Sequence, residues 1–252
     1  LQPPTTIPRV IDPRESVARC PQHGAQVRSV DPKCPWRLDP IGHPYQIQCP
    51  IGGEWYPSNR YDQGDRTSGP FPDDGNGFTV EGIRYFPLRE YGHMIYGTVV
   101  IPTLRSLSQA YLLTGDRRYA HKGCVLLARL ATVYPNYGWE GDDPTLENRF
   151  DRTYLGPWNN QHPYYTWKHG GLITDCIWEC LCLDALAYVY DAFYDYLDDD
   201  PELIGFVADH GLKVKDGAEL RSYIETYILR SGMRAIQAKW VWGNEGHHQS
   251  AA

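Results

Sequence analysis

Segment 91–133 constrains the fold most strongly, because apolar residues recur in it at helical spacing on both sides of a single interruption. In the first half they follow one another at intervals of three and four until Thr114, Gly115 and Asp116 break the pattern. A glycine just after the last periodic residue ends a helix, and an aspartate after it is a favourable N-cap for the next one. A second apolar stripe follows and stops before Pro135, a residue that disrupts a helix interior. The sequence therefore predicts a helical hairpin with a tight turn.

Three later segments also carry apolar residues at the spacing of a helix. The longest is 172–196, which is hydrophobic almost all round and is predicted to be a central buried helix. Residues 202–215 form a weaker helix that Gly211 or Gly217 interrupts, and 218–239 carries a final apolar stripe. The chain is therefore predicted to be mainly α.

The remaining segments lack helical periodicity. Residues 1–86 are dense in Pro, Gly, Asp and Arg, which predicts a loop-rich segment with a few short strands. Residues 135–170 are irregular and strongly aromatic. A loop of about 35 residues inside a compact domain is either functional or disordered, and aromatic residues argue against disorder. We expect 135–170 to line a cleft, and we divide the chain into an N-terminal segment at 1–86 and a helical domain at 87–252.

The composition narrows the classes of partner. The 252 residues carry a formal charge of -7 and show no basic stripe, which argues against a nucleic-acid partner. The sequence contains no apolar run of about 18 residues, the length that spans a bilayer. Aromatic residues make up 13% of the chain. Their flat amphipathic surfaces suit carbohydrate, although tyrosines can equally fill a helical core.

One short motif suggests a metal site. Cys20-Pro-Gln-His23 resembles half of a zinc knuckle, in which a thiolate and an imidazole are separated by two residues. Cys34 and Cys49 can complete a set of four ligands, so the sequence allows a structural zinc ion. The second half departs from the pattern, because Gly52 stands where a zinc ribbon usually places another cysteine. The alternative is an irregular loop with free thiols.

Hydrogen-bonding side chains are most concentrated near the end of the sequence. Asn244, Glu245, His247, His248 and Gln249 lie within six positions, next to indoles that can stack on a sugar or close a pocket. Residues 250–252 read as the first turn of another helix, so we expect the sequence to continue in a longer protein. The side chains expected to contact a sugar are Trp139, Trp158, Asn160, His162, Tyr164, Tyr165, Trp242 and Gln249.

Several motifs occur in a characteristic order. They are CPIGGEWYPSN at 49–59, DDGNGF at 73–78, YLLTGDRRYAH at 111–121, LLARLATVYP at 126–135, and Gly243-Asn244 with His248-Gln249. The segments at 111–121 and 126–135 resemble the helical hairpin of the heparinase II/III and alginate-lyase group of polysaccharide lyases. The other motifs resemble elements of bacterial members, in the same order. The likeness covers most of residues 45–252.

The resemblance implies an incomplete (α/α) toroid built of helical hairpins, in an enzyme that cleaves uronate-containing polysaccharides by β-elimination. That chemistry requires no cofactor, but the proton beside the uronate carboxylate becomes acidic only when a donor neutralises that carboxylate. Asn244 matches the family position that donates to it, and His247 or His248 can assist. In the family the catalytic tyrosine and a further histidine lie downstream of that position, and this sequence ends before them.

The leading interpretation is a periplasmic or secreted bacterial lyase that binds an acidic polysaccharide. A toroid glycoside hydrolase is one alternative. It would need two carboxylates facing each other across the cleft, and the plausible suppliers are Glu140, Asp142, Asp143 and Asp175. A non-catalytic glycan-binding or scaffold domain is the other alternative, in which the histidines are hydrogen-bonding groups at helix ends.

Overall fold

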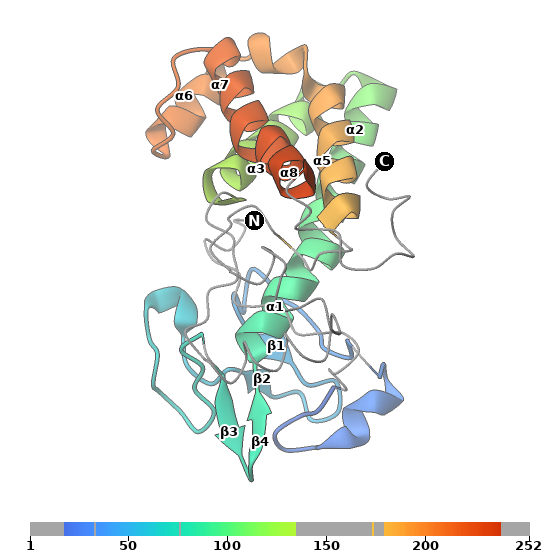
Figure 1. The fold of residues 1–252 in the computed structure, drawn as a ribbon, viewed down its shortest axis with the longest axis vertical. Helices are drawn as coiled ribbons and strands as arrows, with labels where there is room; N and C mark the ends of the chain where they lie inside the picture. Colours follow the sequence, from blue (N-terminus) through green and yellow to red (C-terminus); the bar gives the residue numbers. More distant parts are fainter. Residues whose placement is uncertain (1–17, 33, 76, 135–172, 174–178, 238–252) are drawn as a thin grey trace. The chain divides into compact units, whose positions relative to one another are not determined.

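The computed structural model describes residues 18–32, 34–75, 77–134, 173 and 179–237 (Figure 1). Their contacts divide them into two compact units, one ending at Ile95 and the other beginning at Tyr96. We call the described residues 18–95 the N-terminal unit and the described residues 96–237 the helical unit. The chain is mainly α, as predicted, with a few short strands. Within the described ranges no helix is long and apolar enough to cross a membrane.

The N-terminal unit is built of loops, short turns and two small antiparallel sheets, which confirms the predicted loop-rich segment with short strands. In one sheet Ile47 lies opposite Tyr56, and in the other Phe78 lies opposite Tyr85. The contacts also place the first α-helix in this unit. The elements are η1 Ala25–Ser29, β1 Ile47–Gln48, β2 Trp55–Tyr56, η2 Tyr61–Gln63, β3 Phe78–Val80, β4 Ile83–Tyr85 and α1 Pro87–Ile95.

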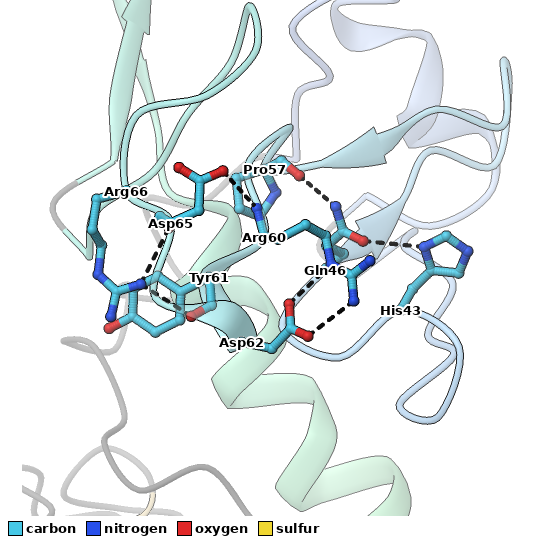
Figure 2. A network of polar contacts seen from close by, with 8 residues as sticks. All are labelled: His43, Gln46, Pro57, Arg60, Tyr61, Asp62, Asp65 and Arg66. Carbon is cyan, nitrogen blue, oxygen red and sulfur yellow. Dashed lines mark hydrogen bonds and ion pairs between the residues drawn. The ribbon is translucent and has the colours of Figure 1, made fainter.

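Polar side chains hold part of this unit together, as Figure 2 shows. The buried Gln46 donates through Nε2 to the carbonyl oxygen of Pro57 at 2.7 Å, and its Oε1 lies 3.1 Å from Nδ1 of His43. Arg60 binds both carboxylate oxygens of Asp62, at 3.0 and 2.9 Å. An exposed ion pair of this kind contributes little to stability, whereas the buried amide fixes the loop that follows β2.

Asn59 is fully buried and connects two loops. Its Nδ2 donates to the carbonyl oxygens of Asp65, at 2.8 Å, and Asp73, at 3.0 Å. Its Oδ1 accepts the backbone N–H of Asp73 at 2.8 Å. The amide therefore satisfies backbone groups that these loops cannot satisfy through a sheet or a helix.

The buried carboxylate of Asp73 connects the following turn to helix α1. Oδ1 accepts the backbone N–H groups of Gly75, at 2.8 Å, and Gly77, at 2.7 Å. Oδ2 accepts the N–H of Leu88, at 3.2 Å, in the first turn of α1, where backbone donors lack an intrahelical partner. Asp73 thus acts as a helix cap from a distance.

The helical unit contains the predicted hairpin. Helices α2 and α3 pack against each other and are joined at Gly115, which is left-handed with φ 67°, and Asp116, whose side chain accepts the N–H of Arg118. The predicted turn and N-cap are both confirmed. The elements are η3 Tyr96–Val100, α2 Ile101–Thr114, α3 Arg117–Val133, α5 Glu179–Phe193, η7 Tyr196–Asp198, α6 Pro201–Asp209, α7 Gly217–Ile224, η8 Glu225–Leu229 and α8 Arg230–Gln237.

Two features of the helices differ from the sequence predictions. The π-helical segments η3 and η8 interrupt the helices predicted at 91–113 and 218–239. The spacing of apolar residues did not predict them, because it does not reveal a helical turn that holds one extra residue. Helix α5 was predicted to be buried all round, but Leu181 is 49% exposed and Tyr188 46% exposed. Its apolar residues therefore form one buried and one exposed face.

Close packing joins α5 to its neighbours in the helical unit. A Cβ atom at Gly123 of α3 would lie 2.4 Å from the ring of Phe193, which is fully buried at the end of α5. A Cβ atom at Gly232 of α8 would lie 2.3 Å from a methyl group of Leu183. Both glycines are therefore required for close approach of the helices rather than for backbone conformation.

Asp200 connects α3 to the start of α6. Its Oδ1 accepts the N–H groups of Glu202 and Leu203, so it is the N-cap of α6. Its Oδ2 lies 2.8 Å from Nδ1 of His121 and accepts the hydroxyl of Tyr196. Burial raises the pKa of Asp200, but the hydrogen bonds from Tyr196 and His121 outweigh that effect and hold the pKa below its ordinary value.

Substitution of Asp73 should destabilise the N-terminal unit. Asp73→Ala removes the acceptor of three backbone N–H groups, and each buried donor left unsatisfied costs about 1–3 kcal/mol. We expect the free energy of unfolding, measured by urea denaturation, to fall by at least about 2 kcal/mol. Asp74→Ala makes the same chemical change at the exposed neighbouring residue and should have a much smaller effect. Equal losses in the two variants would contradict the capping role.

Candidate metal centre

The first loop of the site runs from Cys20 to Gly24. The N–H of Cys20 donates to the carbonyl oxygen of Gly24 at 3.0 Å, and the N–H of Gly24 donates back to Cys20 at 2.8 Å. Gly24 has a φ of 55°, a left-handed conformation that glycine adopts without strain. The closed loop places Sγ of Cys20 3.6 Å from Nδ1 of His23.

The second loop connects β1 to β2. The N–H of Cys49 donates to the carbonyl oxygen of Glu54 at 2.8 Å, and the N–H of Gly53 donates to the carbonyl oxygen of Cys49 at 3.0 Å. The first bond lies directly beyond the last pair of β1 and β2, Gln48 and Trp55, and the second closes a turn from Cys49 to Gly53. The loop places Sγ of Cys49 3.6 Å from the same Nδ1 of His23.

Cys20, His23 and Cys49 form a group that could hold a metal ion. Their ligand atoms all lie within 4.8 Å of one another, both cysteines are buried, and neither forms a disulfide. Two thiolates and an imidazole suit zinc, which prefers sulfur and nitrogen ligands. Three of the four predicted ligands are therefore brought together from two loops that lie far apart in the sequence.

Cys34, the other predicted ligand, is exposed and lies outside this group. Its backbone N–H donates to Oδ1 of Asp31 at 2.7 Å, so the aspartate side chain closes a turn of the backbone there. Cysteine spacing alone could not separate this exposed residue from the two buried ones.

The environment of the two thiols differs. Burial raises the pKa of Cys49, while hydrogen bonds from the backbone N–H groups of Gly52 and Ile51 lower it, and the net shift is upward. The thiol of Cys20 donates to the hydroxyl of Tyr56 at 3.5 Å, and that hydroxyl donates to Oε1 of Gln22 at 2.6 Å. A metal ion at this place would bind the thiolate forms, and the N–H groups of Gly52 and Ile51 could then hydrogen-bond the sulfur of Cys49.

The predicted sugar-binding and catalytic residues lie outside the described residues. They fall in 135–172 and 238–252, so their arrangement is not described here. They are Trp139, Trp158, Asn160, His162, Tyr164, Tyr165, Trp242, Asn244, His247, His248 and Gln249.

Glu90 carries a half-buried carboxyl that the sequence did not single out. Desolvation raises its pKa to about 7, against the opposing effects of the Trp36 side chain and the Arg89 guanidinium. Arg89 is itself only 3% exposed. The sequence shows only a charged pair in the first turn of a helix, a place where such residues are ordinarily solvated.

Known proteins provide no further assignment of the site. Comparisons with protein-family models, with curated proteins and with solved structures found no match. The chemistry of the site therefore follows from its own residues and from the sequence motifs.

Stability should depend on pH through Glu90. Because its folded pKa is raised from 4.5 to about 7, its contribution is fully present below about pH 4.5 and is lost as the pH rises through 7. At about 1.4 kcal/mol per pKa unit the loss is at most roughly 3 kcal/mol, because the side chain is partly exposed to solvent. Glu90→Gln cannot ionise, so its free energy of unfolding should fall less than that of the wild type between pH 5 and pH 8.

Urea denaturation at these two pH values measures the difference. Glu81→Gln makes the same chemical change at an exposed residue and should leave the wild-type pH dependence intact. Equal losses of stability in Glu90→Gln and the wild type over this range would show that the pKa of Glu90 is not raised.

Proposed function

We propose that this protein is a polysaccharide lyase, or the N-terminal part of one, that cleaves a uronate-containing acidic glycan by β-elimination. The observation that carries the proposal is the position of the two hairpin motifs. Segment 111–121 spans the end of α2, the turn at Gly115 and Asp116 and the start of α3, and segment 126–135 lies on α3 as far as Val133. The two helices are consecutive and pack against each other. Helices α5 and α7 contact this hairpin, which supports a layered helical architecture. An incomplete (α/α) toroid is the architecture that we propose for it.

The proposed chemistry makes Asn244 the principal donor to the substrate. Its neutral amide would hydrogen-bond the uronate carboxylate and so acidify the neighbouring proton. His247 or His248 would assist, and the aromatic segment 135–170 would line the cleft. No cofactor is needed for this elimination. We place the enzyme in the periplasm or outside a bacterial cell, where acidic polysaccharides are accessible.

We further propose that zinc joins the two loops of the N-terminal unit through Cys20, His23 and Cys49. In a tetrahedral site with Zn–S near 2.3 Å and Zn–N near 2.0 Å, sulfur and nitrogen lie about 3.5 Å apart. Both sulfurs lie 3.6 Å from the imidazole nitrogen. A small unit of loops gains stability from such a cross-link because its apolar core is limited.

Removal of the Asn244 amide tests the lyase proposal. In the full-length protein, Asn244→Ala should lower the rate of unsaturated uronate formation, followed by its ultraviolet absorbance, by about 100-fold or more. Gln109→Ala, which removes an exposed amide on α2, should leave the rate unchanged. Unchanged turnover in Asn244→Ala would contradict the proposal. Cleavage without an unsaturated end would indicate a hydrolase, and binding without cleavage would indicate a glycan-binding domain.

Metal content tests the zinc proposal. The protein purified with zinc should retain one equivalent per chain, measured by elemental mass spectrometry after dialysis. Cys49→Ser should lose the metal, because serine replaces a thiolate with a poorly ionised hydroxyl. Cys34→Ser should retain it, since Cys34 lies outside the group. Equal retention in the two variants would contradict the assignment.

A further inference from the structure

Three side chains surround one imidazole nitrogen of the candidate metal centre. Nδ1 of His23 lies 3.6 Å from Sγ of Cys20, 3.6 Å from Sγ of Cys49 and 3.6 Å from Oε2 of Glu54. A neutral imidazole nitrogen carries either one proton or one lone pair, so it cannot hydrogen-bond all three partners at once. A cation placed between the sulfurs and the imidazole can bind those three atoms, whose mutual separations stay within 4.8 Å, and Glu54 is the nearest carboxylate to them that contacts His23.

The distance between the imidazole and the carboxylate agrees with a tetrahedral zinc site. With Zn–N near 2.0 Å and Zn–O near 2.1 Å, nitrogen and oxygen lie about 3.4 Å apart, and nitrogen and sulfur lie about 3.5 Å apart. The observed separation between Nδ1 of His23 and Oε2 of Glu54 is 3.6 Å, close to that value. Glu54 thus lies beside the histidine but outside the group of Cys20, His23 and Cys49, so a rotation of its side chain brings the carboxylate to the fourth position.

Gly52 explains how Glu54 reaches this place. A Cβ atom at Gly52 would lie 2.2 Å from Oε1 and 2.4 Å from Oε2 of Glu54, and 2.3 Å from Cε1 of His23. The carboxylate therefore occupies the space that a side chain at Gly52 would take. The backbone of Gly52 is not left-handed, so its conformation does not require glycine. The missing Cβ instead leaves room for the carboxylate beside the histidine.

The carboxylate of Glu54 also has an unsatisfied atom. Oε2 is buried and has no hydrogen-bond partner among the described residues. A carboxylate oxygen in that state carries a desolvation cost that coordination to a metal would remove. The backbone bond between Cys49 and Glu54 holds both residues at the base of the same loop.

We propose that Glu54 is the fourth ligand of the metal centre, which then consists of two thiolates, an imidazole and a carboxylate. This inference rests on the proposed zinc site at Cys20, His23 and Cys49. A carboxylate at Glu54 supplies the same single negative charge that a cysteine at Gly52 would supply as thiolate. The ligand charge therefore matches that of a three-cysteine, one-histidine site, while one hard oxygen replaces a soft sulfur.

Binding of zinc and of cobalt, the latter a spectroscopic substitute, tests the proposal on the full chain. Wild-type protein with cobalt should show the visible bands of a tetrahedral ion and the near-ultraviolet charge-transfer intensity of two thiolates. Glu54→Gln should weaken zinc binding, measured by competition with a chelator, by at least about tenfold. Glu54→His supplies a new ligand and should recover most of that loss, whereas Glu81→Gln should bind as the wild type does.

A pair of variants at Gly52 tests whether the Glu54 carboxylate occupies the space of a side chain at this position. Gly52→Cys alone places its side chain against Glu54, so it should bind zinc less tightly than the double variant Gly52→Cys/Glu54→Ala. The double variant should add the charge-transfer intensity of a third thiolate to the cobalt spectrum. If the single variant binds as tightly as the double one, Glu54 does not occupy the ligand position.

The possible outcomes separate this inference from the zinc site itself. A wild type that binds neither zinc nor cobalt would overturn the whole metal centre. A wild type that binds both, with Glu54→Gln unchanged in affinity and cobalt spectrum, would overturn the role of Glu54 alone. Loss of binding in Glu54→Gln and Glu54→His to the same extent would also overturn it, because a ligand role predicts recovery by histidine.

Discussion

The N-terminal unit depends on the meeting of two backbone loops at the imidazole of His23. Each loop is closed by its own hydrogen bonds, but loops of this length bury little apolar surface to offset the entropy of ordering them. Polar contacts join them at the hydroxyl of Tyr56, which Cys20 and Gln22 contact, and at the imidazole of His23. A cation there would replace weak contacts with coordinate bonds and would couple folding of the unit to metal binding. Asn59 and Asp73 stabilise the neighbouring loops through the same kind of polar contact. Their buried amide and carboxylate groups hydrogen-bond backbone groups that lie in no long strand or helix.

The helical unit is held together by different interactions. Its helices approach closely where a glycine faces a large side chain, as at Gly123 and Phe193. Its one prominent buried polar network, among the residues described, is centred on Asp200, which combines an N-cap with bonds to side chains of two other elements. Because these bonds hold the pKa of Asp200 below its ordinary value, the carboxylate stays charged in mildly acidic solution and the network persists there.

The extent to which this structure could be predicted from sequence depends on the kind of signal. The helix ends at Gly115 and Asp116 were predicted correctly. These residues act on their own backbone, so they end one helix and begin the next whatever the segment packs against. Burial was less predictable: the apolar pattern of α5 did not reveal that Leu181 would be exposed, because a pattern does not specify which neighbours cover it. The metal centre was predicted in part. Spacing identified Cys20, His23 and Cys49, but it also selected the exposed Cys34 and gave no reason to consider Glu54, whose position depends on the loop between two strands.

That loop has a consequence for strand pairing. Cys49 and Glu54 are opposite each other directly beyond the last paired residues of β1 and β2, Gln48 and Trp55. In an antiparallel ribbon, a slip of one residue turns every side chain of a strand to the opposite face. A metal ion bound by both Cys49 and Glu54 would be incompatible with such a slip, because one of the two ligands would then point away from it. Metal occupancy would therefore select the register of a ribbon only two residues long on each strand, a length at which pairing alone specifies register weakly.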